Sequence, residues 1–214
     1  MMPLGASALT ARDFEAGPSG PLDPASLDVS DHSLLPRVGL KGRGACAWLE
    51  RRGIAVPKSA NSWRTDQELL IVRLGLNEFL LEGPTAPFLD LAQIKAEDCV
   101  YPVVRQDTAL ALRGPGLLTL IAQTCALNIQ AFDAEGRPAV LTIVADIPVL
   151  LITDLKNPAP SALVWTCRSY GVYLFETLGS LAAQSGIHLA LRRPDGQLRF
   201  PQSSYLHHPQ GGAL

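Results

Sequence analysis

Apolar positions recur at strand and helix spacing over residues 37–193, and the pattern predicts short elements of both kinds. The run RVGLKG is typical of a strand. GACAWLERRG predicts a short helix with Ala45, Trp48 and Leu49 on one face, which Gly53 ends. QELLIVRLGLNEFLLEG holds two apolar runs around a Gly-Leu-Asn-Glu segment, which indicates a hairpin.

The chain continues with a helix pattern over TAPFLDLAQIKAED and then with VYPVVRQDTALALRG, which predicts two strands that turn near Gln106 and Asp107. PGLLTLIAQTCALNI predicts a helix that begins at Pro115. This helix is apolar on most faces, so we expect it to be buried on both sides. The runs AVLTIVADI, PVLLITD and SALVWTCR indicate three strands. The last helix pattern, RSYGVYLFETLGSLAAQSG, ends at Gly186 and has a stripe of Tyr170, Tyr173, Leu174, Leu178 and Leu181.

An internal repeat accompanies these elements. GLKGRGACAWL aligns with ALRGPGLLTLI at an offset of 72 residues, which places Gly42 on Gly114 and Gly44 on Gly116. Each pair lies between a strand and a helix, where free N–H groups could hold an anion. Neither has the spacing of a phosphate or dinucleotide loop, so a tight turn is the favoured interpretation. The sequence thus predicts an α+β fold of two related, ferredoxin-like strand-helix-strand-strand units, at about residues 34–105 and 106–193.

The two ends of the chain differ from this core. Eight of the 17 prolines lie in residues 1–36 and 194–214. We therefore expect an arm over residues 1–33 that is disordered or wraps a partner, a domain over residues 34–193, and a tail over residues 194–214.

The low content of charged residues limits the classes of partner that the sequence predicts. Only 18% of the residues are charged and the net charge is −2, whereas about 25% is typical. Without a basic block, nucleic-acid binding is not expected. The longest apolar run, VLTIVADIPVLLI, is broken by Asp146 and Pro148, so no membrane span is expected either. The first twenty residues lack a signal peptide, which favours the cytoplasm. Interface cores are depleted in charge, so we expect one face of the core to contact a partner.

Candidate chemistry is sparse. The four cysteines form no C-x-x-C pair, no metal site is expected, and no nucleophile motif is present, so no catalytic residue is assigned. Asp146 lies in an apolar segment, either in a turn between strands or as a functional acid. Arg168 lies beside aromatic residues and could bind a carboxylate or a pterin-like ring, or form a structural ion pair. The candidate ligand-binding residues are Arg168, Tyr170, Asn77 and Trp63, and turn or core roles are the alternative for the last two.

Several segments carry a resemblance to a known family. They are RVGLKGRGACAWLERRGIAVP, NSW, LIVRLGLNEFLLEG, LRGPGLLTLIAQTCALNI and WTCRSYGVYLFETL. In order and spacing they resemble the gamma subunit of heterotetrameric sarcosine oxidase over about residues 34–182. More distantly, the chain is similar to the folate-binding aminomethyltransferase (T-protein) of the glycine cleavage system, whose fold the gamma subunits share in reduced form.

The resemblance implies a noncatalytic subunit of a flavoprotein complex that oxidatively demethylates sarcosine or a related N-methyl amino acid. It implies that FAD, FMN, NAD and tetrahydrofolate are bound by larger partner subunits and none by this chain alone, and that the isolated chain could self-associate. The folate-using relatives carry R-x-G-Y-T-G-E-x-G-Y-E where this chain has WTCRSYGVYLFE, which keeps only Arg168, aromatic residues and Glu176. The alternatives are a stand-alone tetrahydrofolate-binding, aminomethyltransferase-like protein and an unrelated binding module.

Overall fold

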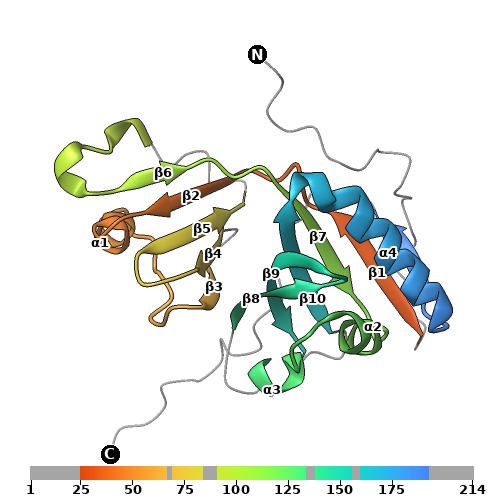
Figure 1. Cartoon of the computed structure of the whole chain (residues 1–214). Coiled ribbons are helices and arrows are strands. Elements are labelled where there is room, and N and C mark those ends of the chain that lie inside the picture. Colours follow the sequence, from red (N-terminus) through yellow and green to blue (C-terminus); the bar gives the residue numbers. More distant parts are fainter. Residues whose placement is uncertain (1–24, 67–68, 84–90, 134–137, 156–159, 193–214) are drawn as a thin grey trace, which may run out of the picture.

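The computed structural model describes residues 25–66, 69–83, 91–133, 138–155 and 160–192 (Figure 1). Within these residues the elements are, in chain order, β1 (Ser26–Asp31), β2 (Arg37–Lys41), α1 (Ala45–Glu50), β3 (Ser62–Asp66), β4 (Leu69–Arg73), β5 (Glu78–Glu82), η3 (Leu91–Gln93), η4 (Ala96–Asp98), β6 (Tyr101–Val103), β7 (Asp107–Arg113), α2 (Leu117–Thr124), α3 (Ile129–Asp133), β8 (Ala139–Val144), β9 (Ile147–Asp154), β10 (Ser161–Cys167), η5 (Arg168–Tyr170), α4 (Gly171–Gln184) and β11 (His188–Arg192). The elements η3, η4 and η5 are 3-10 helices.

The strands form two sheets. Sheet A has the order β11-β1-β7-β10-β9-β8, and sheet B has the order β3-β4-β5-β2-β6. Neighbouring strands are antiparallel in both sheets, except that β1 runs parallel to β11. The mixed α+β class expected from the sequence is therefore confirmed.

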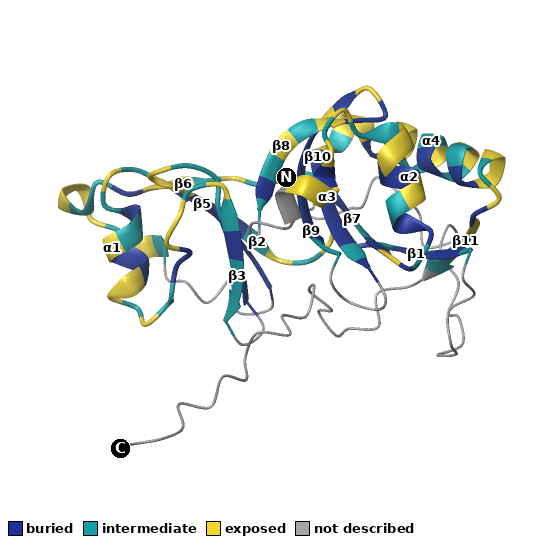
Figure 2. Ribbon diagram, turned by 90° about the horizontal axis from the view of Figure 1, so that it is seen from below, coloured by how far each residue is buried: buried dark blue, intermediate teal, exposed yellow. Residues whose placement is uncertain are grey.

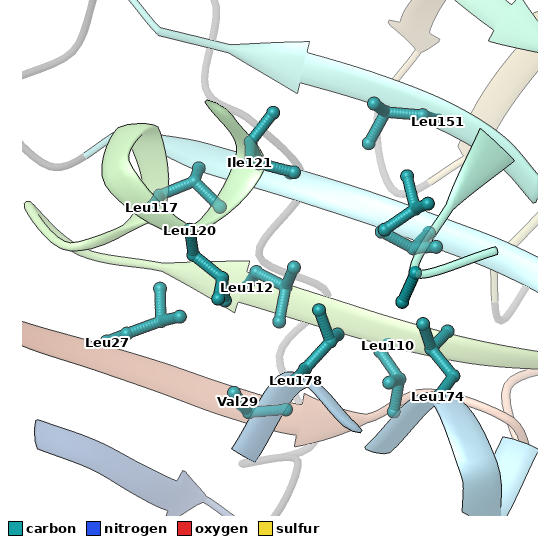
Figure 3. Close-up of a cluster of buried hydrophobic side chains, with 14 of the residues drawn as sticks. Leu27, Val29, Leu110, Leu112, Leu117, Leu120, Ile121, Leu151, Leu174 and Leu178 are labelled. Atoms are coloured by element: carbon teal, nitrogen blue, oxygen red, sulfur yellow. The ribbon is translucent and has the colours of Figure 1, made fainter. Parts of the chain in front are cut away.

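The elements stack in four layers, in the order α1, sheet B, sheet A, and α2 with α4 (Figures 1 and 2). Alternate residues of each strand point to opposite faces, so each sheet has one face toward its helices and one toward the other sheet. Figure 3 shows the core between sheet A and its helices, to which β1 gives Leu27 and Val29, β7 gives Leu110 and Leu112, and the helices give Leu117, Leu120, Leu174 and Leu178.

A separate core lies between the two sheets. Trp63, Leu70, Val72 and Leu80 of sheet B pack there against Ala109, Ala139, Leu150, Ile152, Leu163 and Trp165 of sheet A. All ten side chains are at most 4% exposed. The two sheets are thus joined by an extensive apolar contact.

The repeat seen in the sequence is real in the structure. The N–H of Gly42 donates to the carbonyl of Asn77, and the N–H of Gly114 donates to the carbonyl of Pro160, both at 2.9 Å. Gly42 and Gly114 have φ angles of +123° and +141°, which favour glycine. The order β3-β4-β5-β2-β6 of sheet B recurs in sheet A as β8-β9-β10-β7-β1. Apart from β11, which only sheet A contains, the two sheets are therefore topological copies of each other.

Equivalent positions of the two copies touch at two places. Glu82 and Trp165 each lie five residues after the equivalent acceptors Asn77 and Pro160, and the Nε1–H of Trp165 donates to Oε2 of Glu82 at 2.7 Å. Ser62 and Pro138 are likewise equivalent, and they form an isolated antiparallel bridge between β3 and the start of β8. Contacts between equivalent positions are expected at a local two-fold axis.

The units differ in detail from the expectation. Four strands rather than two follow α1 within residues 34–105, and four follow α2 within residues 106–193, so the ferredoxin-like strand-helix-strand-strand detail is not confirmed. The expected strands near Gln106 are present, but β6 belongs to sheet B and β7 to sheet A. In the segment expected to be an arm, Ser26–Asp31 forms β1, which lies between β7 and β11. Residues 1–24 and 193–214 lie outside the described residues.

Some helix predictions were wrong. In the segment expected to be one apolar helix, residues 115–129, helix α2 ends at Thr124 and α3 begins only at the last residue, Ile129. Helix α2 buries Leu117, Leu120 and Ile121, while Ala122 and Gln123 are exposed. It is therefore covered on one side. Only the short η3 and η4 are seen in the described part of TAPFLDLAQIKAED.

Helix α4 buries Leu174, Leu178 and Ala182, whereas Tyr170 and Tyr173, expected on one stripe with Leu174 and Leu178, are 43% and 47% exposed. Among the described residues, no helix combines the length and apolar character needed to cross a bilayer.

Candidate functional site

The chain passes between the sheets at two crossovers, residues 32–36 and residues 104–106. Arg37 follows the first crossover at the start of β2, and Asp107 follows the second at the start of β7. The two crossovers lie close to each other, and the side chain of Arg37 links them by binding a backbone carbonyl at one end of each. Its Nη1–H donates to the carbonyl of Asp107 at 2.7 Å and its Nη2–H to the carbonyl of His32 at 2.6 Å.

The third nitrogen of Arg37 faces a carboxylate. Its Nε lies 3.0 Å from Oε2 of Glu82, and the two side chains are 2% and 0% exposed. The same oxygen accepts the hydrogen bond from Trp165 of sheet A. Arg37, Glu82 and Trp165, which we call the junction cluster, therefore link the end of β5, both crossovers and β10.

Burial dominates the electrostatics of this cluster. It raises the pKa of Glu82, and the attraction of Arg37 and the hydrogen bond from Trp165 offset this only in part. Asp107 raises the same pKa further, and Arg105, which forms an ion pair with Asp107 at 2.9 Å, lowers it. Oε1 of Glu82 has no hydrogen-bond partner among the described residues.

This geometry suits a structural role. Glu82 is fully buried, so its carboxylate cannot reach a molecule in the solvent without rearrangement of the sheets. In the described ranges, no three His, Cys, Asp or Glu residues lie together as a metal site would require. The four cysteines are free thiols. Among these thiols, Cys167 has the features of a reactive nucleophile, because its side chain is exposed and hydrogen bonding to Ser169 lowers its pKa.

The four candidate ligand-binding residues lie in three environments. Trp63 is 3% exposed and belongs to the core between the sheets. Asn77 is exposed in the β4–β5 turn of sheet B, where its carbonyl accepts the Gly42 bond. Arg168 and Tyr170 lie together in η5, which follows β10 of sheet A. The structure therefore brings Arg168 and Tyr170 together, while Asn77 belongs to the other sheet.

The structure also bears on two further residues singled out in the sequence, Arg168 and Asp146. No carboxylate within the described part of the chain forms an ion pair with Arg168. Asp146 is exposed in the two-residue turn of the β8–β9 hairpin, with φ of +65°, which is the turn role. Arg37 and Glu82 were missed because neither carries a motif, although Glu82 ends the otherwise apolar run FLLEG, where a buried charge needs a partner.

The chain was compared with known proteins. No protein-family model matches the sequence, and no curated protein matches it. A chain of heterotetrameric sarcosine oxidase from Corynebacterium sp. U-96, in complex with pyrrole 2-carboxylate, is similar in structure with a TM-score of 0.63 and 18% sequence identity. The match covers 76% of this chain and 87% of that chain.

A second structure is similar at a TM-score of 0.50 and 16% identity, the glycine cleavage system aminomethyltransferase T from Bartonella henselae. This match covers 78% of the present chain but 48% of that chain, so the chain spans about half of the aminomethyltransferase. The fold is the one expected from the sequence resemblance. With fewer than one residue in five identical, the likeness is one of fold.

Proposed function

We propose that this protein is a noncatalytic gamma-type subunit of a heterotetrameric sarcosine oxidase-like flavoprotein complex. The observation that carries the proposal is the extent of the structural match. Of 214 residues, 76% is about 163, and these make up 87% of the matched chain, which therefore has about 187 residues. The matched chain is thus small, and the similarity extends over most of it, which supports the assignment of the present chain as a small subunit.

The site chemistry is in keeping with a structural subunit. The most buried charged group, Glu82, joins the two sheets and is closed to solvent. In this proposal FAD, FMN, NAD and tetrahydrofolate are bound by the larger subunits, which oxidise an N-methyl amino acid. The present chain contributes contact surface rather than reacting groups.

The alternative function is a tetrahydrofolate-binding, aminomethyltransferase-like protein that acts without partners, for which Arg168 and Tyr170 would be the ligand-binding residues. The aminomethyltransferase likeness favours it. It is the weaker proposal because this chain spans only 48% of that enzyme. Calorimetric titration of the isolated chain with tetrahydrofolate decides between them. Saturable heat that Arg168→Ala abolishes supports the alternative, and its absence removes it.

The main proposal is tested by purifying the tagged chain from its native host. We expect it to bring down larger chains in fixed stoichiometry, with the visible absorbance of bound flavin and sarcosine-dependent oxygen consumption. A chain recovered alone as a monomer would contradict the proposal.

A further inference from the structure

Strand β8 is apolar on both faces, apart from Thr142. Its sequence, AVLTIV, places Ala139, Leu141 and Ile143 on one face and Val140, Thr142 and Val144 on the other. A strand with one face in water normally carries polar residues there. Leu141 and Ile143 are nevertheless 68% and 42% exposed. This pattern is typical of a strand that is buried on both sides in its working state.

The internal repeat shows that this apolar surface is not required by the fold. Leu141 lies opposite Leu150 in sheet A, and Thr65 lies opposite Leu70 at the equivalent place in sheet B. The β3–β4 hairpin ends one pair further on, at Asp66 and Leu69. The β8–β9 hairpin is longer by two residue pairs, Ile143 with Pro148 and Val144 with Ile147. The extension has no counterpart in sheet B.

The two-pair extension of the β8–β9 hairpin packs against the core beneath sheet A and is hydrogen-bonded to the end of α2 and the residues after it. Val144 and Ile147 are 1% and 5% exposed and belong to the core between sheet A and the helices α2 and α4. The N–H of Ala126 donates to the carbonyl of Ile143 at 3.3 Å, and the N–H of Ala145 donates to the carbonyl of Thr124 at 3.0 Å. The hairpin tip is therefore held in place with one face still open.

The free edge of β8 is blocked at both ends. At its start, the N–H of Ala139 donates to the carbonyl of Asn61 at 2.8 Å, and near its end Ile143 is bonded to Ala126. Little backbone remains for the addition of another strand. A partner would therefore contact the exposed side chains of Leu141, Ile143 and Pro148, which we call the hairpin face.

The hairpin face continues the core between the sheets. Leu141 lies opposite Leu150, which sheet B covers, so the apolar surface runs without a break from the buried core to the solvent. Asp146, at the turn, is the only charged residue between Ala139 and Thr153, whereas residues 62–73 of sheet B contain four. The layer that completes this surface must therefore be apolar and uncharged, as sheet B is over the rest of the face. A membrane surface would instead favour flanking Lys or Arg, which this hairpin lacks.

We propose that the hairpin face is the docking site for a larger subunit of the complex, which supplies the apolar layer that the shorter β3–β4 hairpin leaves out. This inference rests on the proposed function and names the surface through which it operates. Side chains that become fully desolvated near the centre of a contact carry much of its binding energy.

The test uses the complex purified through the tagged chain, with the double variant Leu141→Lys/Ile143→Lys and the matched control Thr65→Lys at the equivalent place in sheet B. We expect the wild type and the control to retain the flavoprotein chains, and the double variant to lose them at least tenfold. Because Leu141 and Ile143 are exposed, the isolated double variant should melt within a few degrees of the wild type. The mild variant Leu141→Ile/Ile143→Val should keep the partner.

Each outcome is decisive. If the wild type recovers flavoprotein chains and the folded double variant recovers them equally well, the docking site is wrong and the proposed function stands. If the wild type recovers none, both are wrong. If the isolated wild type is a dimer by light scattering and the double variant is a monomer, the face binds a second copy instead, which also overturns the proposal.

Discussion

Replacement of Arg37 by Met tests whether the junction cluster holds the two sheets together. Arg37→Met leaves the carboxylate of Glu82, which is 0% exposed, without its cation and removes both hydrogen bonds to the crossover carbonyls. Removing one partner of a buried ion pair typically costs about 3–5 kcal/mol. We expect the free energy of unfolding at pH 8 to fall by about this amount.

The pH dependence gives a second readout. The folded-state pKa of Glu82 is raised above its ordinary value of 4.5, so its contribution to stability is fully present below 4.5 and is lost as the pH rises through the folded-state pKa. The wild type should therefore lose stability relative to Glu82→Gln as the pH rises. In Arg37→Met the carboxylate has lost its cation, so the folded-state pKa of Glu82 should rise further, and the loss should extend to higher pH and become larger in total.

Urea unfolding followed by tryptophan fluorescence measures both effects, because Trp63 and Trp165 lie in the core between the sheets. The control is Arg37→Met/Glu82→Gln, which removes both charges and keeps an oxygen to accept the Trp165 hydrogen bond. It should recover most of the loss. The reasoning is refuted if Arg37→Met costs less than about 1 kcal/mol at pH 8, or if the double variant loses as much as the sum of the single variants.

Three further changes have defined outcomes. Gly44→Ala should destabilise by about 1–3 kcal/mol in thermal unfolding, because its Cβ would overlap the carbonyl oxygen of Asp98, whereas Gly75→Ala meets no atom and should change stability by less than about 0.5 kcal/mol. Ala145→Asn/Asp146→Gly should raise the melting temperature, by a stability gain of about 1 kcal/mol, because both turn residues have positive φ; no gain would contradict the turn assignment. With a thiol reagent at pH 7, Cys167 should react faster than Cys46, whose pKa is raised by burial, and Ser169→Ala should slow Cys167; equal rates would contradict this.

Local features of the fold could be predicted from the sequence. The strands around Gly75, the strand pair around Asp146 and the two glycine turns depend on residues close together in the chain, and the structure contains all of them. The pairing of distant strands could not be predicted in the same way. Strand β1 belongs to sheet A although the next strand, β2, belongs to sheet B, and β6 belongs to sheet B although β7 belongs to sheet A. No residue near β1 or β6 indicates this exchange, because the apolar pattern of a strand does not specify which strand pairs with it.

The junction cluster was hidden for a related reason. Arg37 and Glu82 are 45 positions apart, and Arg37 begins one apolar strand while Glu82 ends another, where a solvent-facing charge would look the same. Only the register of β2 with β5 places them opposite each other. The sequence also misled about Tyr170 and Tyr173, which are exposed because the buried face of α4 is formed by Gly171, Leu174, Leu178 and Ala182.

The position of β1 has a consequence for the order in which the protein is made and folds. Val29 pairs with Leu112 on one side and with Leu191 on the other, whereas sheet B is drawn from residues 37–103 alone. During synthesis sheet B can close while the C-terminal half is still on the ribosome, and β1 must wait with Leu27 and Val29 uncovered until both of its neighbours emerge. Closing such distant contacts is slow, so final incorporation of β1 should be the late step in refolding, and the stage at which a chaperone is most useful.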